Sequence, residues 1–108
     1  QWNEEICMAA AKSGQLKTLQ YLFQNGCPWD LETCAEASAH GQLECLKYAH
    51  QNGCPWNKST TKNAAQGKHL DCLTFAIEHG CDFDAKTLKA AVASGDPEIV
   101  LYLASKGI

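Results

Sequence analysis

The tetrapeptide Gly-Cys-Pro-Trp at residues 26–29 returns at residues 53–56, and it returns again as Gly-Cys-Asp-Phe at residues 80–83. The interval is 27 residues each time, and the 108-residue chain is four such intervals long. A unit of this size cannot bury a hydrophobic face by itself, so it must stack on its neighbours. The sequence therefore predicts a single repeat domain over residues 1–108. Its four units are expected at about residues 1–25, 26–52, 53–79 and 80–108.

The residues after each tetrapeptide predict the start of a helix. Asp30 is a good N-cap because its carboxylate can accept hydrogen bonds from the first free amides of a helix. Trp29 precedes it and Cys34 follows it at the spacing of a hydrophobic staple, which fixes the angle of entry. The arrangement recurs in the other units and is weakest in the third, where Thr61 replaces the apolar partner. We expect Trp29 and its counterpart Trp56 to be wedges between successive units.

Two helices fit within each unit. In the second unit the first helix is predicted to run through residues 33–39 and to end at Gly41. The second helix runs from about residue 43 to residue 51, where apolar residues recur at helical spacing. The glycine that ends the first helix recurs in every unit, although Gly67 comes one residue early. No segment alternates polar and apolar residues over the length of a strand. The predicted fold class is therefore all-α, a solenoid of four stacked helix-turn-helix repeats.

Two stretches of each unit resemble a known repeat. Residues 53–57, Gly-Cys-Pro-Trp-Asn, resemble the Gly-Ala-Asp-Val-Asn of ankyrin repeats, and residues 41–48, Gly-Gln-Leu-Glu-Cys-Leu-Lys-Tyr, resemble their Gly-His-Leu-Glu-Val-Val-Lys-Leu. The resemblance covers all four units. The period is shorter than the roughly 33 residues of an ordinary ankyrin unit, and residues 33–35 do not carry the family's Thr-Pro-Leu-His motif. The β-hairpin fingers are therefore expected to be shortened or absent. The Gly-Cys-Pro-Trp spelling also resembles short ankyrin-like arrays of protists and giant viruses.

The resemblance implies a protein–protein interaction module, since ankyrin-like arrays bind a protein partner through the first helices and the loops before them. With Cys34 and Ala37 facing inward, Ala35 of the second unit and Ala90 of the fourth are expected to face outward with the charged residues of the same helices. The predicted partner-binding residues are Glu5, Met8, Lys12, Glu32, Glu36, Ala39, Lys58, Lys62, Lys86 and Lys89. The alternative is a structural spacer in a larger protein, with no ligand of its own.

These residues predict a surface that is electrically polarised along the array. Glutamates predominate in the first two units and lysines in the last two. A partner is then expected to dock with a basic end on the first two units and an acidic end on the last two. The alternative is two solvated faces that serve solubility.

Composition excludes several other classes of function. The net charge is −3 and the chain contains no arginine, so the basic footprint of a nucleic-acid-binding protein is missing and no nucleic-acid partner is expected. The sequence has no run of about 18 apolar residues, so no membrane span and no membrane partner are predicted. No sequence motif indicates a cofactor or a small-molecule substrate. The last helix is expected to leave an apolar side uncovered at Ile99, Val100 and Leu103, which suggests that the chain is a piece of a longer array. The alternative is that Tyr102 and Lys106 cover that side.

Seven cysteines and four histidines are the residues that could carry chemistry. Repeat registers explain the cysteine spacing, and residues at one register lie about 8–10 Å apart, too far for a disulfide. We therefore expect small buried thiols, no metal site and no enzyme, because neither a Cys-x-x-Cys pair nor a cleft for a Cys–His pair is predicted. The histidines are expected near helix ends, where the dipole favours a cation. Reduced thiols predict an intracellular, cytoplasmic protein, with secretion as an effector into another cell as the alternative.

Overall fold

In the computed structural model, residues 2–107 are described, and they form eight α-helices and no strand. The helices are α1 (Glu4–Lys12), α2 (Leu16–Gln24), α3 (Leu31–Ala39), α4 (Leu43–Gln51), α5 (Lys58–Gln66), α6 (Leu70–Glu78), α7 (Ala85–Ser94) and α8 (Pro97–Ser105). The segments before α3, α5 and α7 are short irregular loops, where a longer ankyrin unit has its hairpin. The predicted all-α fold is confirmed.

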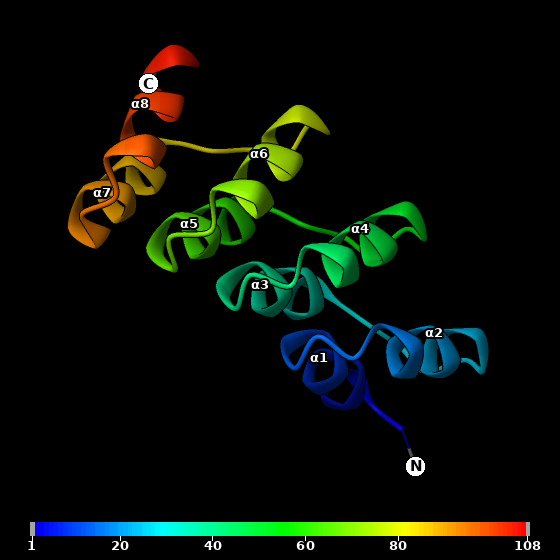
Figure 1. The fold of residues 1–108 in the computed structure, drawn as a ribbon. Coiled ribbons are helices and arrows are strands. Elements are labelled where there is room, and N and C mark those ends of the chain that lie inside the picture. Colours follow the sequence, from blue (N-terminus) through cyan, green and yellow to red (C-terminus); the bar gives the residue numbers. More distant parts are fainter. Residues whose placement is uncertain (1, 108) are drawn as a thin grey trace.

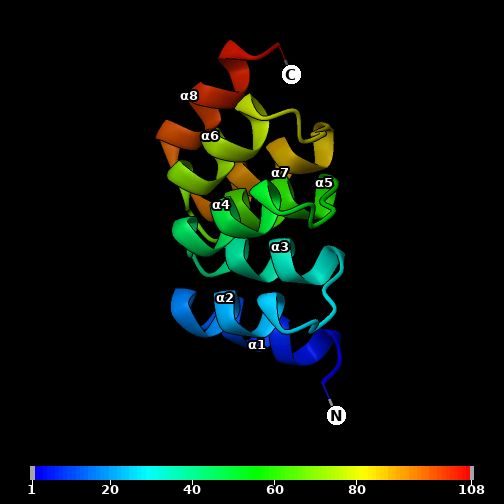
Figure 2. The same cartoon turned by 90° about the vertical axis from the view of Figure 1, so that its right-hand side faces the viewer.

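The helices form two layers along an elongated molecule of 42 × 21 × 18 Å (Figure 1). A first layer contains α1, α3, α5 and α7, and a second contains α2, α4, α6 and α8 (Figure 2). Neighbours in the first layer pack more closely than neighbours in the second. Small buried residues explain this close approach, since Ala11, Ala37 and Ala64 leave room for the adjacent backbone.

Side-chain caps begin each first-layer helix, as predicted. The side-chain oxygen of the cap residue accepts a hydrogen bond from the amide two residues ahead, at 2.9–3.0 Å in all four units. The cap residues are Asn3, Asp30, Asn57 and Asp84. Replacing such a cap with alanine typically costs about 1 kcal/mol of stability. The four caps therefore fix where the first-layer helices begin, and the candidate site lies on these helices.

The cysteine of the tetrapeptide joins each unit to the one before it. Its thiol donates a hydrogen bond to the backbone carbonyl of the preceding cap residue: Cys27 to Asn3 at 3.6 Å and Cys54 to Asp30 at 3.3 Å. Cys81 repeats the contact at 3.2 Å with the carbonyl of Asn57. A small side chain with a weak donor therefore satisfies a carbonyl at each boundary between units.

The two predicted tryptophan wedges lie between units. The Trp29 ring stacks on Phe23 of α2 with 4.0 Å between ring centroids, and it meets Tyr48 of α4 edge-on at 6.3 Å. Trp56 is placed likewise, stacked on the His50 ring at 3.9 Å. Both tryptophans are half-buried rather than fully buried. The wedge prediction is confirmed, with less burial than a core position has.

The apparent slip at Gly67 does not change the register of α5. Gly14, Gly41 and Gly95 have positive φ after their helices, and in the third unit Lys68 takes that left-handed conformation with φ of 64°. Gly67 itself has an ordinary φ of −86°. It is required for another reason: a Cβ built on it would lie 2.7 Å from the backbone oxygen of Ala39 in the neighbouring unit.

Candidate partner-binding surface

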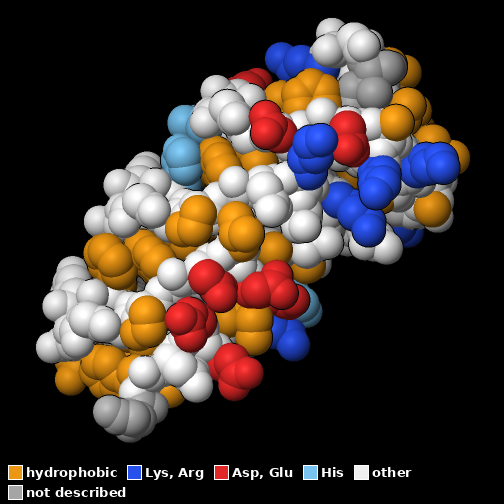
Figure 3. Space-filling view, turned by 180° about the vertical axis from the view of Figure 1, so that it is seen from behind, with side chains coloured by type: hydrophobic (Ala, Val, Ile, Leu, Met, Phe, Trp, Pro, Cys, Tyr) orange, Lys and Arg blue, Asp and Glu red, His pale blue; other side chains and the backbone are white. Residues whose placement is uncertain are grey.

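The predicted partner-binding residues lie on one side of the molecule, along the first layer of helices. We call this side the charged face and define it by the acidic and basic side chains that first-layer helices present to solvent. Acidic side chains gather over one half of it and lysines over the other (Figure 3). The members are Glu4, Glu5, Lys12, Glu32, Glu36, Lys58, Lys62, Lys86 and Lys89, with Lys12 as the one lysine on the acidic half.

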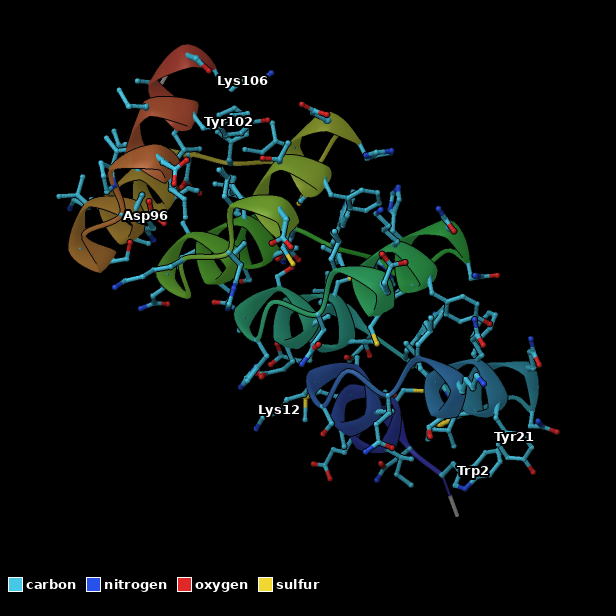
Figure 4. All side chains as sticks on the ribbon, in the orientation of Figure 1. Trp2, Lys12, Tyr21, Asp96, Tyr102 and Lys106 are labelled. Atoms are coloured by element: carbon cyan, nitrogen blue, oxygen red, sulfur yellow. The ribbon has the colours of Figure 1, made fainter. Side chains whose placement is uncertain are left out.

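All ten predicted residues are accessible. Met8, Glu36 and Ala39 are half-buried, and the other seven are exposed. Lys12 projects from the C-terminal end of α1, whereas Trp2 and Tyr21 lie together beside α2 at the N-terminal end of the array (Figure 4). The structure brings Glu5, Met8 and Glu32 together at one hollow and Lys58, Lys62 and Lys86 at another. The remaining four, Lys12, Glu36, Ala39 and Lys89, line neither hollow.

Two alanines expected to face outward do not. Ala35 is 1% exposed and Ala90 is 7% exposed. Ala35 has the same register as Lys62 and Lys89, which are exposed. A one-carbon side chain on a helix packed between α1 and α5 does not reach past its neighbours, while a lysine at that register does. The register of Ala35 does point toward solvent in the units that carry Lys62 and Lys89, but the length of the side chain decides whether it is exposed.

Two hollows of opposite charge occupy equivalent places on the charged face. Each lies at the N-terminal ends of two consecutive first-layer helices. The acidic hollow, of about 340 Å³, is lined by Glu4, Glu5, Met8, Asp30 and Glu32. The basic hollow, of about 290 Å³, is lined by Lys58, Ser59, Lys62, Asp84 and Lys86. The same backbone frame therefore presents a carboxylate-rich site between α1 and α3 and an ammonium-rich site between α5 and α7.

An ion pair crosses the basic hollow between units. Lys58 Nζ lies 3.4 Å from a carboxylate oxygen of Asp84. Slight desolvation of Asp84 raises its pKa, but hydrogen bonds from the Lys86 amide and from Lys58 outweigh that effect, so the pKa falls below its ordinary value. The sequence indicates only a helix cap at the register of Asp30 and Asp84, so the pair was not predicted. The sequence does place Lys58 and Asp84 26 residues apart, one less than the 27-residue period, and this spacing could have indicated a contact between adjacent units.

A larger hollow, of about 620 Å³, lies on the opposite side between α4 and α6. Its lining is mainly apolar, with Leu43, Leu70 and Phe75, and Lys47 and His79 also contribute. The sequence did not predict it. Its space arises because second-layer helices pack less closely than first-layer helices, a property of the stacking rather than of any residue.

The cysteines lie in the core. All seven are buried and have free thiols. Burial is the main reason that the pKa of Cys7, Cys72 and Cys81 is raised to about 12. The thiolate is the nucleophilic form of cysteine, so these side chains are poor nucleophiles at neutral pH.

We expect thiol titration of the native protein to find few fast-reacting groups. A pKa raised from 9.0 to about 12 lowers the thiolate fraction about a thousandfold at a given pH. A chromogenic disulfide reagent should react with all seven thiols after denaturation and with a minority of them before it. Rapid reaction of most thiols in the native state would contradict the burial described here.

Three of the four histidines have the helix position that the sequence indicated. His40 and His79 follow the ends of α3 and α6, and His50 lies in the last turn of α4. His69 is an exception because it is the N-cap residue of α6, where the dipole disfavours a cation. None of the four lines either hollow of the charged face.

The His50 side chain is expected to make stability depend on pH. Its burial, and then the charge of nearby His79, lowers its pKa below the ordinary 6.5. As the pH falls, the unfolded chain therefore takes up a proton first. The contribution of His50 is complete above pH 6.5 and is lost as the pH falls through the lower, folded-state pKa.

His50→Phe reproduces the Phe23–Trp29 stack of the previous unit and should remove this part of the pH dependence. Denaturant midpoints at about pH 7.5 and about pH 5 measure the effect. An identical pH response in the wild type and His50→Phe would show that another group is responsible.

Comparison with known proteins agrees with this architecture. A family model of ankyrin repeats in three copies matches residues 31–108, which is most of the chain. The chain belongs to the ankyrin repeat family. Ankyrin repeats generally act as protein–protein interaction modules. A search of curated protein sequences gave no match. Within residues 2–107, each helix is too short or too polar to cross a membrane.

Proposed function

We propose that the chain is an interaction module that binds a protein partner through the charged face. The observation that carries this proposal is the pair of equivalent hollows with opposite charge. Residues inside the array repeat from unit to unit, as the buried leucines Leu19, Leu46 and Leu73 show. Residues at the hollows change from acidic to basic between equivalent positions, as from Glu5 to Lys86. Variation at exposed positions of a regular frame is what specific recognition requires.

The charge arrangement suggests how a partner is oriented. A basic segment fits the acidic hollow between α1 and α3, and an acidic segment fits the basic hollow between α5 and α7. Exposed charges of this kind mainly accelerate association and set its salt dependence. The same proposal places the protein in the reducing interior of a cell, supported by its seven free thiols. It assigns the chain no catalytic activity, because its cysteines are buried and poorly ionised.

Capture of proteins on the immobilised chain tests the proposal. The wild type is compared with Lys62→Glu/Lys86→Glu, which reverses two charges at the basic hollow. Lys17→Glu/Lys106→Glu makes the same change in net charge outside the first layer. We expect a protein that binds the wild type and this control but not the first variant, and that associates more slowly at higher salt.

Two outcomes argue against the proposal. A partner that binds all three forms equally would lie elsewhere on the molecule. A chain that retains no specific protein under conditions that preserve its helicity would favour the structural spacer. Far-ultraviolet circular dichroism of each variant separates lost recognition from lost folding.

A further inference from the structure

The charge polarity belongs to the first layer of helices and not to the two halves of the chain. In the first layer, α1 and α3 carry four glutamates and one lysine, while α5 and α7 carry four lysines and no acidic residue. The second layer shows the opposite trend. There, α2 and α4 carry two lysines and one glutamate, and α6 and α8 carry three acidic residues and no lysine. The polarity is therefore a property of the charged face.

The lysines of this face stand where helix stability disfavours them. Lys58 and Lys86 lie in the first turns of α5 and α7, where the helix dipole favours acidic residues. The equivalent turns of α1 and α3 do contain acids, at Glu5 and Glu32. Stability of the isolated helices thus explains the acidic half but not the basic half. Within the basic hollow, Asp84 offsets the charge of Lys58, and it is the one carboxylate among three lysines. A further anionic counterpart, on a binding partner, would balance the remaining lysines.

We propose that the counterpart is a second copy of this chain, docked antiparallel on the charged face. This inference rests on the face assigned under the proposed function and names its occupant. In first-layer order the signs are acidic, acidic, basic, basic. Under a two-fold rotation α1 of one copy faces α7 of the other, and α3 faces α5. Every helix then meets the opposite charge, and the two contacts are identical, as in an isologous dimer. A parallel copy would place like charges together.

The size of the face suits a weak, reversible dimer. The broadest side of the two-layer molecule measures 42 by 21 Å, or about 880 Å² in projection, close to the roughly 800 Å² per partner of a standard interface. The charged face belongs to one of the two layers, so each copy buries less than this area. The apolar contribution is small. It comes from Met8, which is half-buried, and from Leu31, which is 40% exposed at the start of α3. An association that depends on charge should be strong at low salt and lost when salt screens it.

Sedimentation velocity over a range of concentrations measures the association. At about 0.02 M salt we expect the wild type to dimerise and at about 0.5 M salt to be monomeric. Two charge-swapped variants provide the decisive comparison. Lys62→Glu/Lys86→Glu makes the face predominantly acidic, and Glu5→Lys/Glu32→Lys makes it predominantly basic. Each alone should dimerise at least about tenfold more weakly than the wild type, and an equimolar mixture should form a one-to-one dimer.

Lys17→Glu/Lys106→Glu is the matched control, because it changes net charge as much as the acidic swap and should still dimerise. A wild type that stays monomeric at low salt overturns the inference. A dimer whose stability does not change with salt concentration also overturns it, as does a dimer that persists in either swapped variant. If the wild type is monomeric while Lys62→Glu/Lys86→Glu loses a captured protein, the proposed function stands and self-pairing alone fails. If Lys62→Glu/Lys86→Glu loses neither the captured protein nor the dimer, both the proposed function and the self-pairing are wrong. Helicity of every variant is checked by circular dichroism.

Discussion

Trp29→Ala is expected to lower the free energy of unfolding by about 3 kcal/mol. Full removal of a buried tryptophan typically costs about 3–5 kcal/mol, and the half-buried position of Trp29 places it at the low end. The ring bridges Phe23 of one unit and Tyr48 of the next, so its loss leaves a gap at the boundary between units. Chemical denaturation followed by circular dichroism measures the change. A domain of this size should melt roughly 15 °C lower.

Trp2→Ala is the matched control for this effect. Trp2 is 43% exposed, and its ring meets Tyr21 edge-on at 6.2 Å instead of stacking between units. Its loss should cost about 1 kcal/mol. A double-mutant cycle of Trp29→Ala with Phe23→Ala should show a coupling of about 0.5–1.5 kcal/mol from the stacked pair. Equal costs for Trp29→Ala and Trp2→Ala would contradict the role of Trp29 as a wedge.

Gly67→Ala is expected to destabilise the array by about 2 kcal/mol, within the usual range for overpacking. The added Cβ would lie 2.7 Å from the Ala39 carbonyl oxygen, which belongs to a backbone and cannot rotate away. Relief requires α3 and α5 to move apart. Denaturant midpoints of the wild type and the variant measure the loss.

Lys68→Gly tests the neighbouring position and should have the opposite sign. Lys68 has φ of 64°, a conformation that glycine adopts without steric cost. After the entropy that glycine loses on folding, the net gain is expected to be about 0.5–1 kcal/mol. If Gly67→Ala were neutral and Lys68→Gly destabilising, the assignment of the two roles would be reversed.

Features set by local sequence were predictable. The cap at Asp30 and the second helix from Leu43 to Gln51 agree with the structure, because a cap and an apolar stripe act within a few residues. The wedge at Trp29 also followed from the sequence, since its register recurs. Repetition supplied what an isolated unit lacks, because each local signal could be read again in the other units.

Apart from the Trp29 wedge, features that depend on contacts between units were not predictable. Ala35 has the register of exposed lysines, and its burial depends on how far neighbouring side chains extend. The pair of Lys58 and Asp84 depends on the offset between units. At Gly67 the sequence shows a displaced glycine, but it does not show that Lys68 takes the left-handed turn. The charged residues of the face were identified, while their grouping into two hollows required the stacked geometry.

The stack of His50 on Trp56 has an optical consequence. An imidazolium in contact with an indole quenches its fluorescence more strongly than a neutral imidazole does. The two rings lie 3.9 Å apart and nearly parallel, at 12°. Trp29 has a phenyl ring in the same position, which carries no proton to exchange. Emission from Trp56 therefore reports whether His50 is charged, and the boundary between the second and third units contains its own indicator of acidity.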